Sequence, residues 1–318
     1  MMHNWIQRLL VLQFLAIMLV SHALATENVP FLLTAASKGE VDTVNAMLAS
    51  GANPNIKDED GVTALMYAAR KDKPEVMTAL IKSGADVNAR DKSAWTPLMY
   101  AAKKNHATSV KVLLESGADF TARDGAGWSA LGLATVSGYA QTVALLMEHG
   151  ADANTKSDDG KTVLMHAAKS GDVATVNLLL NQKANVLARD GLGATALMIA
   201  ARQGHAPVVE LLLSRGAQVN QKDQSKWTAL TWAVKKSQLE VAKHLVAAGG
   251  DVNTSDSEGT PLMHLAVNNG DVGTVKLLLE NKASVKAKDQ YGLTALVYAL
   301  KGQHAEIVKL IKDAGGSY

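Results

Sequence analysis

A seven-residue phrase recurs eight times in this chain at a spacing of 33 residues, and no other feature of the sequence restricts the fold as strongly. The phrase is TALMYAA at 63–69, TPLMYAA at 96–102 and TALMIAA at 195–201, and related forms begin at Ser129, Thr162, Thr228, Pro261 and Thr294. A ninth form, PFLLTAA at 30–36, lies one period upstream. Units of this size must stack, because a single unit cannot bury its own apolar face.

Each period contains two apolar runs and a polar stretch. The second run reads HAPVVELLLSRGA at 205–217, and a typical polar stretch reads DVNARDKSA at 86–94. Apolar residues in both runs follow helical spacing, whereas Asp, Asn and Gly in the polar stretch suit turns. Thr at the start of the phrase is a suitable N-cap, and Pro97 suits the first helical turn. The sequence therefore predicts two short antiparallel helices and a turn in each unit.

These units resemble the ankyrin-repeat family, whose pattern runs roughly DxxGxTPLHxAAxxGHxxxVxxLLxxGAxxN. The resemblance covers about residues 30–316 and is closest at 91–120 and 190–220. It implies an all-α ankyrin-repeat solenoid of about nine helix-turn-helix repeats with short β-hairpin-like turns, and capping repeats at about 30–57 and 289–318. Its concave face would be made by turn tips and first helices. The chain departs from the family at the usual His position, which holds Met in four repeats and His only at His264.

The seventh unit is locally irregular. Thr260-Pro261-Leu262 arrives one residue early, whereas His264 keeps the 33-residue spacing. We expect a tightened turn and an adjusted helix start in this unit.

The amino-terminal segment lies outside the repeats. Arg8 precedes a mostly apolar run, Leu9 to Val20, and Ala23-Leu24-Ala25 provides small residues for a signal peptidase. A spanning helix needs ~20 apolar residues, so this run is short. We expect residues 1–25 to be a cleaved secretory signal peptide and residues 26–318 to form an ankyrin-repeat domain, with a periplasmic or secreted location. The alternative is an uncleaved membrane anchor.

Composition restricts the partner class. The chain has no Cys, which is compatible with an oxidising compartment but uses none of its chemistry. Arg8 is the one charged residue of the signal segment, so the mature chain contains 31 of the 32 basic residues and all 30 acidic residues. This balance argues against nucleic acid as a main partner. We also expect no stable membrane insertion after signal cleavage, and a monomer.

Spacing argues against a metal, cofactor or catalytic site. His106, His205 and His304 share one repeat position three repeats apart, and successive units stack ~10 Å apart, so these rings cannot share an ion and suit a structural role. Met66 and Met99 are likewise one period apart, which favours core packing over copper binding. The GxGxxA matches at Gly125 and Gly191 lie in turns and lack the strand that a nucleotide site requires. We therefore predict no catalytic residues, no cofactor and no enzyme.

Two sets of side chains are candidates for partner binding on the concave face. Trp95, Trp128 and Trp227 directly precede the phrase, and Trp is enriched in binding hot spots. The alternative is that each ring folds back onto the turn of a neighbouring repeat. Basic residues follow the Ala pair and would form a ridge beside the tryptophans: Arg70, Lys71, Lys103, Lys104, Lys169, Arg202, Lys235, Lys236 and Lys301. Tyr67, Tyr100, Trp232 and Tyr298, in contrast, are expected to pack between helices.

The resulting prediction is a non-enzymatic exported scaffold that binds a protein with an acidic, partly apolar surface. It would escort or stabilise an exported enzyme, or neutralise a toxin as an immunity protein, in the periplasm of a Gram-negative bacterium. One alternative is a structural protein of envelope assemblies built through stacked solenoid ends. Another is an enzyme accessory with its own small-molecule site.

Overall fold

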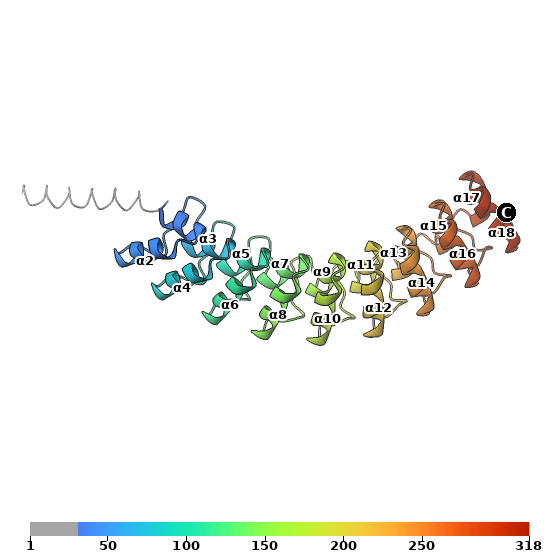
Figure 1. Cartoon of the computed structure of the whole chain (residues 1–318). Helices are drawn as coiled ribbons and strands as arrows, with labels where there is room; N and C mark the ends of the chain where they lie inside the picture. The colour runs from blue at the N-terminus through green and yellow to red at the C-terminus, as the bar shows by residue number, and fades with distance from the viewer. Residues whose placement is uncertain (1–30, 318) are drawn as a thin grey trace, which may run out of the picture. The chain divides into compact units, whose positions relative to one another are not determined.

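The computed structural model describes residues 31–317, so the predicted signal peptide at 1–25 lies outside the described residues. Residues 31–38 are helical, and each later repeat contributes an inner helix, which carries the phrase, and an outer helix (Figure 1). The inner helices are α3 (Ala64–Arg70), α5 (Pro97–Lys103), α7 (Ala130–Val136), α9 (Val163–Ser170), α11 (Ala196–Gln203), α13 (Ala229–Lys235), α15 (Leu262–Asn268) and α17 (Ala295–Lys301). The outer helices are α2 (Val41–Ala49), α4 (Pro74–Lys82), α6 (Ala107–Glu115), α8 (Ala140–Glu148), α10 (Val173–Asn181), α12 (Ala206–Ser214), α14 (Leu239–Ala247), α16 (Val272–Glu280) and α18 (Ala305–Asp313).

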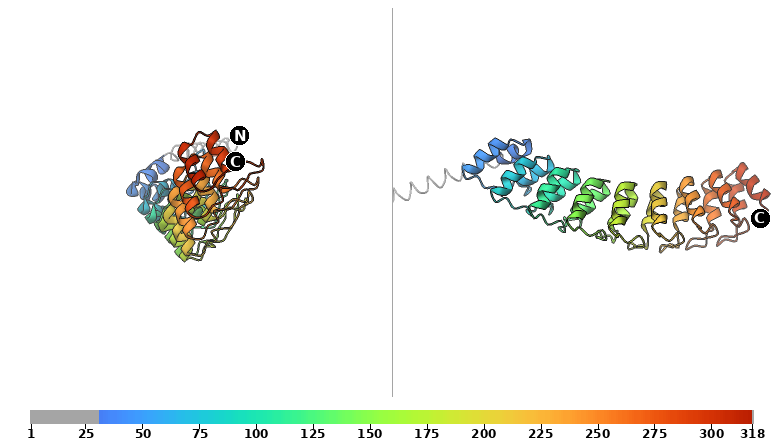
Figure 2. Two further views of the ribbon diagram at one scale, coloured as in Figure 1. Left: turned by 90° about the vertical axis from the view of Figure 1, so that its right-hand side faces the viewer. Right: turned by 60° about the horizontal axis from the view of Figure 1, so that its bottom comes forward.

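The chain divides into two compact units. Among the described residues, one comprises 31–134 with Gln141–Ala151, and the other Thr135–Ala140 with 152–317. Within each unit the loops extend from one side of the helix pairs (Figure 2). Antiparallel bridges close several loops at their base, as between Lys57 and Thr63, which confirms the hairpin-like turns expected from the sequence.

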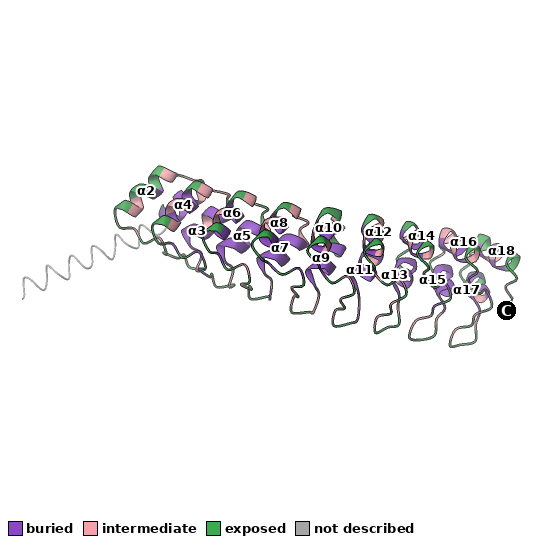
Figure 3. Ribbon diagram, turned by 90° about the horizontal axis from the view of Figure 1, so that it is seen from below, coloured by how far each residue is buried: buried purple, intermediate pink, exposed green. Residues whose placement is uncertain are grey.

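Small side chains allow the inner helices to pack closely. Ala68 and Ala69 have no exposed surface, and Leu65 on the same helix is equally buried. Colouring by burial shows the inner helices almost wholly buried, whereas the outer helices keep one exposed face (Figure 3). Burying one Leu side chain stabilises a fold by ~1.5–3 kcal/mol, so the repeated Leu of the phrase is a main source of stability.

The helix ends follow the predicted local chemistry. Thr63 and Thr96 adopt extended backbone, and each hydroxyl accepts the N–H of the third helical residue. Pro97 occupies the first turn of α5. Gly51 and Gly84, which follow outer helices, have φ of +90° and +89°, where a side chain would be strained.

Polar side chains connect successive repeats in a pattern that the sequence analysis did not anticipate. Nδ2 of Asn55 donates to the carbonyl of Gly84, and its Oδ1 accepts the N–H of Asp86 at 2.7 Å. Nε2 of His106 lies 3.1 Å from the carbonyl of Arg70 in the preceding repeat, and His205 makes the same contact with Lys169. The structural role expected for these two histidines is confirmed, because each ring bonds the backbone of its neighbour.

The expectation of a tightened turn in the seventh repeat is wrong, whereas the helix start is adjusted in its hydrogen bonding. The N–H of His264 bonds the carbonyl of Pro261, three residues earlier, while in the first repeat the N–H of Tyr67 bonds the carbonyl of Thr63, four residues earlier. Helix α15 begins at Leu262, which is in step with Ala64 on the 33-residue spacing. Oδ1 of Asp256 accepts the N–H of Thr260 at 2.8 Å, as Oδ1 of Asp91 accepts that of Trp95 at 2.9 Å. Pro261 fits the N-cap because its φ of −67° and ψ of 150° lie in the extended region that an N-cap adopts.

The proline instead removes a pair of hydrogen bonds. In the first repeat the side chain of Met66 accepts the N–H of Thr63, whereas Pro261 has neither an N–H nor a hydroxyl to offer His264. Nε2 of His264 bonds the carbonyl of Leu293, and its buried Nδ1 has no hydrogen-bond partner in the described part of the chain. A buried acceptor left unpaired costs ~1–3 kcal/mol.

Replacing Pro261 with Thr should therefore stabilise the protein. The new hydroxyl and N–H would cap α15 and pair with Nδ1 of His264, and this gain exceeds the ~0.4–1 kcal/mol that proline contributes by restricting the unfolded chain. We expect a gain of about 1 kcal/mol in the free energy of unfolding in urea. Thr228→Ala, which removes an intact cap, should lower it, and an unchanged or lower stability of Pro261→Thr would contradict the account.

Candidate partner-binding surface

An aspartate at the start of each of several loops holds the loop against the inner helix. In the second repeat, Oδ1 of Asp91 accepts the backbone N–H groups of Ser93 and Trp95 at 2.8 and 2.9 Å. Its Oδ2 accepts the hydroxyl of Tyr100 on α5 at 2.7 Å. One carboxylate thus fixes both the loop conformation and the position of an aromatic ring.

The same arrangement recurs where an aromatic residue follows the aspartate by nine positions. The carboxylate-to-ring hydrogen bonds are Asp58–Tyr67 at 2.8 Å, Asp223–Trp232 at 2.9 Å and Asp289–Tyr298 at 2.5 Å. Repeats with Leu133, Ile199 or Leu265 at this position carry aliphatic side chains that cannot donate such a bond. Four of the eight repeats whose phrase begins at residue 63 or later therefore have a hydrogen bond from the aromatic side chain to the loop aspartate.

The hydrogen bonds alter the acidity of the tyrosines. Burial and the Asp91 carboxylate raise the pKa of Tyr100 well above its usual value. The hydrogen bond to Asp58 and burial raise the pKa of Tyr67, whereas the nearby Arg70 lowers it. Both hydroxyls therefore remain protonated donors at neutral pH.

The predicted tryptophans are half-buried, and each packs on the inner helix of its own repeat. The ring of Trp95 lies 5.0 Å from that of Tyr100, and Trp227 lies 4.6 Å from Trp232. Trp128 covers Gly132, where an added Cβ would come within 3.0 Å of its Cε3. Trp95 and Trp227 therefore contact an aromatic ring on the inner helix of their own repeats. Each tryptophan keeps part of its surface exposed, and partner contact stays a prediction.

The basic residues divide by environment. Arg70, Lys103 and Arg202 are half-buried, whereas the exposed members are Lys71, Lys104, Lys169, Lys235, Lys236 and Lys301. The guanidinium of Arg70 lies 4.7 Å from the ring centre of Tyr67 and 5.9 Å from that of Tyr100. The guanidinium of Arg202 lies 5.2 Å from the ring centre of Trp232. Such contacts attract a cation to the negative face of an aromatic ring.

Two clusters result, one in each compact unit. We call Tyr67, Arg70, Trp95 and Tyr100 the first cluster, and Arg202, Trp227 and Trp232 the second cluster. Both combine predicted site residues with aromatic residues that the sequence analysis assigned to packing between helices. Those rings are half-buried, and Tyr67 and Tyr100 also pack against the buried side chains of the core, as expected from the sequence. The Asp nine positions earlier was the sequence signal for their place in the clusters.

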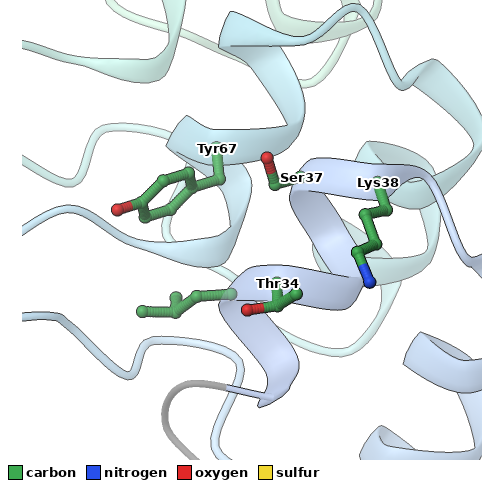
Figure 4. Close-up of a pocket in the computed structure, with 5 residues that line it drawn as sticks. Thr34, Ser37, Lys38 and Tyr67 are labelled. Carbon is green, nitrogen blue, oxygen red and sulfur yellow. The ribbon is translucent and has the colours of Figure 1, made fainter.

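An open pocket adjoins the first cluster. It measures about 390 Å³ and lies between the helical residues 31–38 and α3, where it is lined by Leu33, Thr34, Ser37, Lys38 and Tyr67 (Figure 4). The hydroxyl groups of Thr34 and Ser37 and one side of the Tyr67 ring border the same space. It extends the accessible surface beside Tyr67.

A serine and a histidine replace the Asp–aromatic pair in the fourth repeat. Oγ of Ser157 lies 3.0 Å from Nε2 of His166 and 2.6 Å from Oδ1 of Asp159. Because a carboxylate only accepts hydrogen bonds, the Ser157 hydroxyl donates to Asp159 and Nε2 of His166 donates to Oγ of Ser157. Burial lowers the pKa of His166. The group therefore fastens the loop to the inner helix in the fourth repeat, as the Asp–aromatic pair does in other repeats.

The described residues contain neither a metal-binding cluster nor a membrane-spanning helix. Within residues 31–317, no cluster of three or more His, Cys, Asp or Glu side chains could hold a metal ion. In the same part of the chain, every helix is too short or too polar to cross a bilayer.

Comparison with known proteins gives the same repeat family as the sequence pattern. The family model for ankyrin repeats (3 copies) matches residues 32–124, 122–190, 183–256 and 243–317. The chain is also similar to the crystal structure of the human ASB11 ankyrin repeat domain, with 28% sequence identity and a TM-score of 0.62. That match covers 69% of this chain and 98% of the human domain. Among curated proteins, no match was found.

Removing the Tyr100 hydroxyl should change the response of the fold to alkali. Tyr100 has a raised pKa when folded and a pKa near ~10 when unfolded, so its contribution is complete below pH ~10 and is lost as pH rises through the folded pKa. Tyr100→Phe should lower stability by ~1–2 kcal/mol at pH 8 and make the further loss between pH 10 and 12 smaller. Urea unfolding at each pH measures both effects, and equal alkaline losses in the two proteins would disprove this role.

Proposed function

Because the chain belongs to the ankyrin-repeat family, a family of protein-interaction scaffolds, we propose that it is a non-enzymatic exported protein that binds one protein partner on the inner-helix and loop surface. The half-exposed tryptophans beside stacked arginines support this assignment most directly. Large aromatic rings in fixed positions bury much area at little cost in conformational entropy, which is why they dominate binding hot spots.

The surroundings of these rings favour recognition over a purely structural role. Asp91 and Asp223 already fix the loop and the inner-helix ring in their repeats. Trp95 and Trp227 add a further ring on top, part of which faces solvent. An exposed aromatic surface is costly in water unless a partner covers it.

The exposed lysines define the character of the partner. Six of them lie in the last turn of an inner helix or directly after it, and none of these six takes part in an ion pair among the described residues. A partner with an acidic, partly apolar surface would complement this charge, which mainly accelerates encounter. We propose an exported enzyme that is escorted or stabilised, or a toxin that is neutralised, in the periplasm.

The end of the last repeat favours a monomer over an envelope assembly. Helix α18 buries Ile307 and Ile311 against the fold and exposes Lys309, Lys312 and Asp313. The hydroxyl of Thr294 donates to the carbonyl of Ser317, so the carboxyl-terminal residues cover the base of the last loop. A polar, covered end is what a terminal repeat requires, and it is poorly suited to stacking on a second copy.

Substitution of the three tryptophans tests the binding surface. The variant Trp95→Ala/Trp128→Ala/Trp227→Ala should lose capture of the partner from a periplasmic extract, because each hot-spot ring contributes at least ~2 kcal/mol, or ~30-fold in affinity. Crosslinking and mass spectrometry identify the captured protein, and circular dichroism checks the helices. The control variant Lys111→Ala/Lys243→Ala/Lys309→Ala, on outer helices α6, α14 and α18, should capture normally. Equal capture by both variants would refute the assignment of this surface.

Export is tested separately. We expect the mature protein in the periplasmic fraction to begin at Thr26, as read by amino-terminal sequencing. Leu15→Arg places a charge in the apolar run and should leave an uncleaved precursor inside the cell. Recovery of full-length wild-type protein in the membrane fraction would instead establish an uncleaved anchor.

A further inference from the structure

The described arginines form two classes. Four donate hydrogen bonds to backbone carbonyls or amide side chains, namely Arg90, Arg123, Arg189 and Arg215. Arg70 and Arg202 make no hydrogen bond to a carbonyl, and neither forms an ion pair with a carboxylate in the described residues. They occupy the same repeat position, one in each compact unit.

Aromatic faces hold both guanidinium groups. Arg70 contacts Tyr67 on its own helix and Tyr100 on the next inner helix, and Arg202 contacts Trp232 on the next inner helix. A guanidinium has five N–H donors, so one that contacts an aromatic ring, and in Arg70 also the Tyr67 hydroxyl, keeps N–H groups for a further acceptor. These contacts fix an arginine in place before any ligand binds, which lowers the entropy cost of binding.

The nearby aspartates do not supply that acceptor. The oxygens of Asp58 bond the N–H groups of Asp60 and Val62 and the hydroxyl of Tyr67. Those of Asp223 bond the N–H groups of Ser225 and Trp227 and the indole of Trp232. Because these carboxylates are already engaged with the loop and the ring, each arginine keeps its charge for a ligand.

We propose that Arg70 and Arg202 each bind a carboxylate side chain on an acidic segment of the protein partner, while an apolar side chain next to that carboxylate packs on Trp95 or Trp227. This inference rests on the proposed function and names the chemistry of its surface. The fork of guanidinium N–H groups matches a carboxylate in a bidentate geometry that lysine cannot reproduce. The exposed lysines steer the segment, whereas the two arginines fix its position.

The position of each arginine lets its cluster contact two different side chains of the partner. Arg70 and Trp95 both contact Tyr100, and Arg202 and Trp227 both contact Trp232, so one acidic and one apolar side chain in sequence would meet each cluster. The pocket beside Tyr67 gives the first cluster additional space for a neighbouring side chain. A nucleic acid is disfavoured as the source of the anion because basic and acidic residues nearly balance in this chain.

A synthetic peptide tests the inference without a known partner. The probe carries two Glu-Phe-Glu triplets separated by glycines, and the matched peptide has Gln in place of Glu. Isothermal titration calorimetry should show binding of the Glu peptide and at least tenfold weaker binding of the Gln peptide. The side-chain Nε–Hε signals of Arg70 and Arg202 in nitrogen-15 NMR spectra should shift with the Glu peptide. Wild-type protein that fails to bind the Glu peptide would overturn the proposal.

Arg→Lys variants distinguish the proposed site from simple charge attraction. Arg70→Lys and Arg202→Lys keep the charge but lose the planar fork, and each should weaken peptide binding about tenfold. Lys104→Gln and Lys236→Gln each remove a charge in the adjacent repeat position and should change binding less than threefold. Unfolding curves show whether each variant keeps its fold. Similar losses in the two pairs of variants would contradict the arginine sites.

Partner capture separates this inference from the proposed function. If the wild type captures an exported protein and Arg70→Lys/Arg202→Lys captures it equally well, the arginine sites are wrong and the scaffold function stands. If no exported protein is captured while the Glu peptide binds in an arginine-dependent way, the carboxylate sites stand and the exported scaffold function fails.

Discussion

Close packing between inner helices is the interaction on which the rest of the structure depends. Residues such as Ala68 and Ala69 are fully buried because their small side chains let the next inner helix approach. A larger residue there would separate neighbouring repeats and with them the contacts that cross between repeats, including Asn55 to Gly84 and His106 to Arg70. The aromatic clusters also need this short spacing, since Arg70 reaches the ring of Tyr100 from the preceding helix.

The loop aspartates hold the candidate binding surface in a fixed position on these packed helices. Asp91 satisfies two loop N–H groups with one oxygen and a tyrosine hydroxyl with the other, so the loop, the inner helix and the half-buried Trp95 form one rigid group. Rigid aromatic groups lose little entropy when they bind. The seventh repeat shows how robust the backbone is, because Pro261 removes the cap and leaves His264 underpaired without moving the start of α15.

Much of the fold was predictable because its determinants are local. Thr at the N-cap and Pro97 in the first turn each act within one helical turn, and both have the expected conformations. The candidate surface was only partly predictable. Tyr67, Tyr100 and Trp232 were assigned to packing between helices, because the spacing of nine residues to an aspartate matters only once the loop folds back onto the inner helix.

The sequence by itself determined the repeat, its register and the ends of nearly every helix, since a 33-residue period carries the same local signals to each unit. It also determined which side chains share a repeat position. The tertiary structure decided which of them meet: Arg70 and Arg202 contact rings that follow 30 residues later, whereas Arg90 and Arg189 bond the backbone carbonyls of Arg123 and Lys222 in the next repeat. The physical reason is that such contacts cross between repeats, so they depend on how closely neighbouring helices pack and not on the order of residues within either one.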